Sequence, residues 1–79
     1  MADQPSQAVQ DYLKAIHHLG GGNDFVQPNK IATHLAVKAP SVTGMLKRLA
    51  EAGWIEYTPK SGARLTPPGL SEALRVIRR

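Results

Sequence analysis

One segment near the middle of the chain, PSVTGMLKR, combines hydroxyl groups, small residues and two adjacent cations. An α-helix turns by about 100° per residue, so a buried face centred on Val42 leaves small polar residues and cations on the outer face and its flanks. Hydroxyl and methyl groups can contact base edges, and cations neutralise phosphates. This chemistry favours a helix that enters the major groove of DNA. The residues expected to contact DNA from it are Pro40, Ser41, Thr43, Gly44, Lys47 and Arg48.

Gly44 lies inside this predicted helix, where a glycine costs about 1 kcal/mol relative to alanine. On the outer face it removes a side chain that could otherwise reach a base. We interpret it as a site of close approach to the groove. Base selection would then depend on Pro40, Ser41 and Thr43, and on water and DNA shape.

A second basic element follows in the segment YTPKSGARLT, residues 57–66. Strand-forming residues flank the turn residues PKSG, which predicts a β-hairpin. Lys60 and Arg64 are expected to flank its tip, where cations contact the DNA backbone or the minor groove.

The chain has 79 residues and a net charge of +4, and the charge is uneven. Residues 31–79 carry eight Lys and Arg against three Glu, which favours a polyanionic partner. Charge alone fits an ordinary solubilising surface equally well. With no cysteine, thiolate metal sites and disulfides are excluded, and no apolar run is long enough to span a membrane. The N-terminus lacks the pattern of a signal peptide, so we expect a cytoplasmic protein.

The positioning elements follow from apolar spacing. A first helix capped by Ser6 carries a stripe through Leu13 and Ile16 and ends at three glycines, residues 20–22. A short second helix starts at Pro28, and the third, about 40–52, stops at Gly53. Strands in WIEYT and ARLT follow, Pro67-Pro68-Gly69 breaks the second strand, and a last helix covers 68–79. This order predicts a mainly α fold with a small β-hairpin: a winged helix-turn-helix of three helices, a two-stranded wing and a C-terminal linking helix, forming one domain over 1–79.

Three segments together resemble the metal-dependent repressors related to the diphtheria toxin repressor and the manganese transport regulator. They are DYLKAIHHL, IATHLAVKAPSVTGMLKRLAEAGWI and RLTPPGLSEALRVIRR, and they cover nearly the whole chain. The resemblance implies a dimeric repressor of metal-homeostasis genes that binds operator DNA and is activated by Mn²⁺ or Fe²⁺. It also implies that the last helix leads to a dimerisation domain beyond this chain.

The resemblance places one metal ligand here, Asp11, at a first-helix position where manganese-type members carry aspartate. Lys14 stands where those members can have a second carboxylate, and the other ligands are expected beyond Arg79. We therefore expect this chain alone to bind Mn²⁺ weakly or not at all. His17 and His18 are adjacent and cannot form an i, i+4 pair, so we expect no metal role for either. His34 is expected near the DNA backbone or at the surface.

Two alternatives remain open: a winged helix of a metal-independent regulator, and a winged helix that binds protein. An enzyme is not expected, because the sequence shows no nucleophile–histidine–acid set, paired carboxylates or phosphate-binding loop. The three glycines at 20–22 follow a predicted helix, not a strand, so they are expected to act as a helix terminator.

Overall fold

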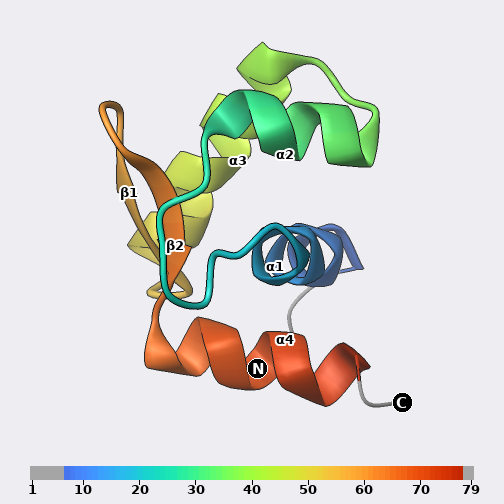
Figure 1. Cartoon of the computed structure of the whole chain (residues 1–79), viewed down its shortest axis with the longest axis vertical. Helices are drawn as coiled ribbons and strands as arrows, with labels where there is room; N and C mark the ends of the chain where they lie inside the picture. The colour runs from blue at the N-terminus through green and yellow to red at the C-terminus, as the bar shows by residue number, and fades with distance from the viewer. Residues whose placement is uncertain (1–6, 78–79) are drawn as a thin grey trace.

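The computed structural model describes residues 7–77, which form four helices and one hairpin (Figure 1). The predicted Ser6 cap and residues 78–79 of the predicted last helix lie outside this range. The order of elements confirms the predicted winged helix-turn-helix plan. The elements are α1 (Gln7–His18), α2 (Pro28–Leu35), α3 (Ala39–Glu51), β1 (Ile55–Thr58), β2 (Gly62–Leu65) and α4 (Pro67–Ile77).

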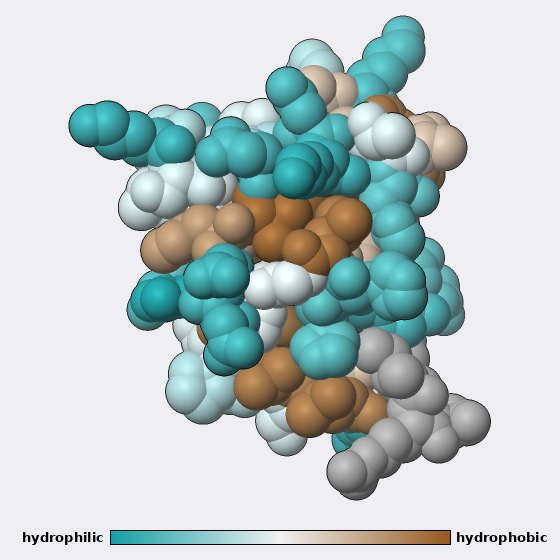
Figure 2. Space-filling view, in the orientation of Figure 1, coloured by the Kyte–Doolittle hydropathy of each residue, from teal (hydrophilic) through white to brown (hydrophobic). Residues whose placement is uncertain are grey.

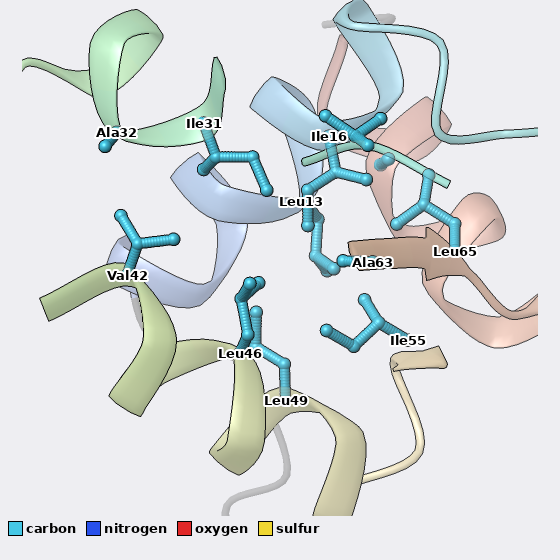
Figure 3. Close-up of a cluster of buried hydrophobic side chains, with 12 residues drawn as sticks. Leu13, Ile16, Ile31, Ala32, Val42, Leu46, Leu49, Ile55, Ala63 and Leu65 are labelled. Carbon is cyan, nitrogen blue, oxygen red and sulfur yellow. The ribbon is translucent and has the colours of Figure 1, made fainter. Parts of the chain in front are cut away.

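The core lies where α1, α2, α3 and the hairpin converge (Figure 3). Leu13 of α1, Ile31 of α2 and Leu46 of α3 point toward one another and have no exposed surface. Burial of one such side chain stabilises the fold by about 1.5–3 kcal/mol. The apolar stripes read from the sequence of the first three helices therefore supply this core, and α3 is held with its opposite side toward solvent.

Helix α3 begins and ends one residue earlier than predicted. Its N-cap is Lys38, whose side chain makes no capping hydrogen bond, and Pro40 occupies the first turn. At the other end Gly53 has φ +87°, and the amide of Trp54 donates to the carbonyl of Leu49 at 3.0 Å. This left-handed conformation suits glycine and confirms Gly53 as the stop.

The turn between α2 and α3 contains a left-handed alanine. Ala36 has φ 58°, and the amide of Val37 bonds back to the carbonyl of Ala32 at 3.0 Å. A non-glycine residue in this region costs about 1–2 kcal/mol. Nothing in the sequence marks this residue as left-handed, because alanine is a helix former. The turn directs α3 across α2, as a helix-turn-helix requires.

The hairpin is antiparallel, with Ile55 opposite Leu65 and Thr58 opposite Gly62. The connector after α1, predicted only as a link, adds an edge to it. Val26 and Ala63 exchange two backbone hydrogen bonds, of 2.7 and 2.9 Å. A Cβ on Gly62 would lie 2.2 Å from the carbonyl oxygen of Val26, so only glycine allows this approach.

The second strand ends at Leu65, which confirms the predicted break before Pro67-Pro68-Gly69, and helix α4 starts at Pro67, one residue earlier than predicted. The first helical amides need no helical partner, which lets two prolines open the helix. The hydroxyl of Thr66 accepts from the amide of Gly69 at 3.2 Å and donates to the carbonyl of Gly53 at 2.6 Å. Thr66 thus caps α4 and ties it to the end of α3.

Helix α4 lies against α1 on the side away from α2 (Figure 1). Figure 2 shows hydrophilic residues around α2, and apolar surface in the middle of this face and along α4. On α4, Leu74 is 36% exposed. No helix within residues 7–77 combines the length and the hydropathy that a bilayer span requires.

Candidate nucleic-acid interface

The outer face of α3 brings together most of the residues that the sequence assigned to DNA. Of the predicted DNA-contacting residues on α3, all but one are exposed. The opposite face of the helix is buried in the core through Val42, Leu46 and Leu49. Since the buried face is fixed by packing, the exposed face is fixed with it. The exposed members of the predicted set on α3 are Pro40, Ser41, Gly44, Lys47 and Arg48.

The two cations of α3 are free of ion pairs with any residue that the structure describes. The three ion pairs found in residues 7–77 involve Lys14, Arg64 and Arg75. Lys47 and Arg48 are adjacent, so their side chains leave the helix about 100° apart. They can therefore reach phosphates on two sides of the helix.

One flank of α3 opens onto a hollow of about 430 Å³ shared with α1. Ala8 and Tyr12 line it from α1, and Ser41, Gly44 and Arg48 line it from α3. Tyr12 was not among the residues predicted to contact DNA. Partial burial raises the pKa of its hydroxyl. Its place in the apolar stripe of α1 gave no signal that it also lines this hollow.

Gly44 lies in open space. A Cβ built on it meets no atom within 4 Å, so packing does not require a glycine here. The absence of a side chain keeps the hollow beside α1 accessible. A larger residue would project from the outer face without a clash.

Thr43 differs from the other predicted contacts because it is half-buried. Its hydroxyl donates to the carbonyl of Ala39, one turn earlier, at 3.3 Å. The oxygen keeps its acceptor capacity, and the bond fixes the side-chain rotamer.

The hairpin presents its two predicted cations differently. Lys60 is exposed in the loop between β1 and β2, where the amide of Ser61 donates to the hydroxyl of Thr58 at 3.0 Å. Arg64 lies within β2, opposite Glu56, and the two side chains form an ion pair. The Arg64 guanidinium also stacks 4.7 Å above the ring of Phe25. The expectation that Arg64 flanks the tip is therefore wrong, because β2 already begins at Gly62.

Asp11, the predicted metal ligand, lies on the exposed side of α1. Its Oδ1 accepts from the Nε2 of Gln7 at 3.0 Å and lies 3.8 Å from the Nζ of Lys14. Within residues 7–77, no three histidine, cysteine, aspartate or glutamate side chains could together hold a metal ion. Mn²⁺ and Fe²⁺ require more ligands than one carboxylate, so the described residues do not form a site for them by themselves.

The three histidines separate in the structure. His17 is half-buried, and His18 and His34 are exposed, with ring centroids 5.5 Å apart. The sequence gives no indication of the His18–His34 contact, because the two residues belong to different helices.

Comparison with known proteins agrees with this geometry. The family described as "Iron dependent repressor, N-terminal DNA binding domain" matches residues 5–63. A helix-turn-helix transcriptional regulator of Methanocaldococcus jannaschii is 33% identical over 73 residues, which cover 91% of this chain and 58% of that protein. The transcriptional regulator MntR of Lysinibacillus sphaericus is 29% identical over 75 residues, which cover 95% of this chain and 54% of MntR. The chain thus spans little more than half the length of these relatives.

Two solved structures share the fold. A hypothetical protein from Sulfolobus solfataricus superposes with a TM-score of 0.80 at 23% identity, over 94% of this chain and 57% of that one. ScaR with bound Zn²⁺ superposes with a TM-score of 0.74 at 31% identity, over 94% of this chain and 33% of ScaR. The named relatives are transcriptional regulators and not enzymes. From the match over residues 5–63 and the winged helix that displays α3, the chain belongs to the iron-dependent repressor family, in the region of its N-terminal DNA-binding domain.

Proposed function

We propose that this chain is the DNA-binding part of a sequence-specific transcriptional repressor of metal-homeostasis genes. Residues 40–52 would enter the major groove of operator DNA, and residues 57–66 would rest on the backbone or in the minor groove. The observation that carries the proposal is the exposed face of α3, with Lys47 and Arg48 unpaired among the described residues. A regulator of this kind acts beside the chromosome, which agrees with the predicted cytoplasmic location.

Sequence reading would depend on short side chains. Pro40 and the methyl group of Thr43 can contact a thymine methyl, and the hydroxyl of Ser41 can hydrogen-bond to a base edge or phosphate. Gly44 offers no side chain, which allows the helix to approach the groove closely. Shape and water-mediated contacts then carry part of the specificity.

Metal control would involve Asp11 with ligands from residues beyond Arg79 of a longer chain, and Mn²⁺ or Fe²⁺ as the ion. The name MntR and the Zn²⁺ bound to ScaR belong to those proteins and support a divalent metal here. An oxygen ligand favours the harder Mn²⁺. A homodimer would place two recognition helices in successive major grooves.

The test of DNA binding uses fluorescence anisotropy with duplexes selected by the chain from a random-sequence pool. We expect a defined motif, and affinity that falls steeply as salt rises, because each phosphate neutralised releases counterions. Thr43→Ala should change the selected motif. Binding that shows no salt dependence and no preferred motif would favour the protein-binding alternative.

The test of metal control is a Mn²⁺ titration of this chain and of a longer chain that contains it. We expect weak or no binding to the 79-residue chain and clear binding to the longer one, lost in Asp11→Ala. Tight 1:1 binding of Mn²⁺ to the 79-residue chain would contradict the proposed ligand set.

A further inference from the structure

Two imidazole rings from different helices meet beside the groove between α1 and α2. His18 is the last residue of α1 and His34 lies in the last turn of α2. Their ring centroids are 5.5 Å apart and their planes are tilted by 43°. Both side chains are exposed, so each ring can rotate without displacing a core residue.

The separation of the rings suits a shared ion. Two imidazoles that bind one tetrahedral ion have centroids about 5 Å apart, since each metal–nitrogen bond is about 2.0–2.1 Å and each nitrogen lies about 1 Å from its ring centre. The observed 5.5 Å is close to that value. The helices are held by the core, with Ile16 and Ile31 fully buried, so the backbone positions that carry the two rings are fixed relative to each other.

We propose that His18 and His34 together bind a divalent transition-metal ion that favours nitrogen ligands, such as Zn²⁺ or Ni²⁺. Imidazole suits these ions, whereas Mn²⁺ favours oxygen ligands. No further histidine, cysteine or acidic side chain within residues 7–77 completes a set of three, so water fills the other positions. Two protein ligands give a weaker site than the three or four of catalytic and structural zinc sites.

The surroundings of the site allow a cation and its water. A hollow of about 310 Å³ adjoins the rings, lined by Asp11, Lys14 and Ala15 of α1 and by Leu35 of α2. The Lys14 ammonium lies 3.8 Å from the Asp11 carboxylate, so their charges offset each other. Asp11 and His18 are seven residues apart, two turns along α1, which separates this site from the metal control proposed for Asp11.

An ion held here would fasten α1 to α2, because its two ligands come from different helices. Since the unfolded chain does not hold the two rings together, the ion binds the folded state preferentially and raises its stability. Neither histidine belongs to the exposed face of α3.

The experiment titrates the whole 79-residue chain with Zn²⁺ at pH 7.5, since protons compete with metals for imidazole. Binding is measured by calorimetry and by the NMR signals of the three imidazole rings. His18→Gln and His34→Gln are compared with the matched control His17→Gln, which changes a neighbouring histidine on α1. Circular dichroism verifies that each variant is folded.

We expect 1:1 binding, with both His18 and His34 signals shifted and the His17 signal unchanged. His18→Gln and His34→Gln should each lose at least about tenfold in affinity, because changes even to outer-shell groups of metal sites cost 10–100-fold. His17→Gln should bind within about twofold of the parent chain, and Mn²⁺ should not shift the two rings. Equal binding by all four chains, equal loss in His17→Gln, or Mn²⁺ binding at the same rings would each overturn the proposal.

Discussion

Helix α3 and the hairpin each carry two of the predicted DNA-contacting cations, and the surroundings of these cations differ between the two elements. On α3, Lys47 and Arg48 are exposed and without an ion-pair partner in the described part of the chain. On the hairpin, Lys60 is exposed, but Arg64 is paired with Glu56 and stacked on Phe25. A cation on α3 is therefore free to contact a ligand, whereas Arg64 on the hairpin is engaged within the protein. The sequence alone does not distinguish these two situations.

This difference between the cations follows from how each element is held in the fold. Helix α3 is fixed by its buried face, so its outer side chains are free to act on a ligand. The hairpin buries Ile55, Ala63 and Leu65 in the core, but its two strands are short and Val26 of the connector adds a single bridge to them. Arg64 contributes to holding β2 against Glu56 on β1 and Phe25 on the connector.

The largest expected effect is on stability, and it appears when one glycine of the hairpin and one glycine of α3 are each replaced by alanine. In Gly62→Ala, the new Cβ would lie 2.2 Å from the carbonyl oxygen of Val26, at a residue with φ +105°. We expect a loss of about 3 kcal/mol or more in the free energy of unfolding, since strain and a backbone clash add. Gly44→Ala should instead gain about 0.5–1 kcal/mol, because the position is open and helical. Urea unfolding of both variants measures the contrast.

Removing both cations of α3 should have the largest effect on DNA. In the double variant Lys47→Ala, Arg48→Ala we expect a loss of about 100-fold in affinity at low salt, for all sequences alike. The slope of log K against log salt should decrease by about 2. Arg75→Gln is the control, because it removes a cation from α4, where Arg75 is paired with Glu72. An unchanged slope in the double variant would place the DNA elsewhere.

Much of the fold could be predicted from periodicity and turn residues. Helical spacing predicts the burial of Leu13 and Leu46, and the residue type of Gly53 predicts the end of α3. The role of Arg64 could not be predicted, because Phe25 and Glu56 reach it through a register that the turn alone does not specify. Helix α4 starts one residue earlier than predicted, because the missing amide of a proline is harmless in a first helical turn.

A smaller effect tests whether residue 44, which has no side chain, faces the DNA bases. Gly44→Gln restores a polar side chain on the outer face, and a good side-chain contact to a base is worth about 1–3 kcal/mol of discrimination. We expect a new preference at one base pair in the selected motif, with helix stability raised. Gly44→Ala is the matched control, because it gives the helical gain without the reach. The same motif for all three chains would mean that residue 44 does not face the bases.

The smallest effect separates the two cations of the hairpin. Lys60→Ala should weaken DNA binding a few-fold and reduce the salt slope by about 1, as expected for one phosphate contact. Arg64→Ala should leave affinity within about twofold and lower the free energy of unfolding by about 1 kcal/mol, since exposed ion pairs and cation–π contacts are each worth that or less. Glu56→Gln should give a smaller loss of stability, because Arg64 still stacks on Phe25, without any change in the salt slope. The opposite outcome is that Arg64→Ala lowers DNA affinity as much as Lys60→Ala does and leaves stability unchanged. In that case Arg64 breaks its ion pair with Glu56 in order to contact DNA. The hairpin would then contribute two DNA-contacting cations, as α3 does.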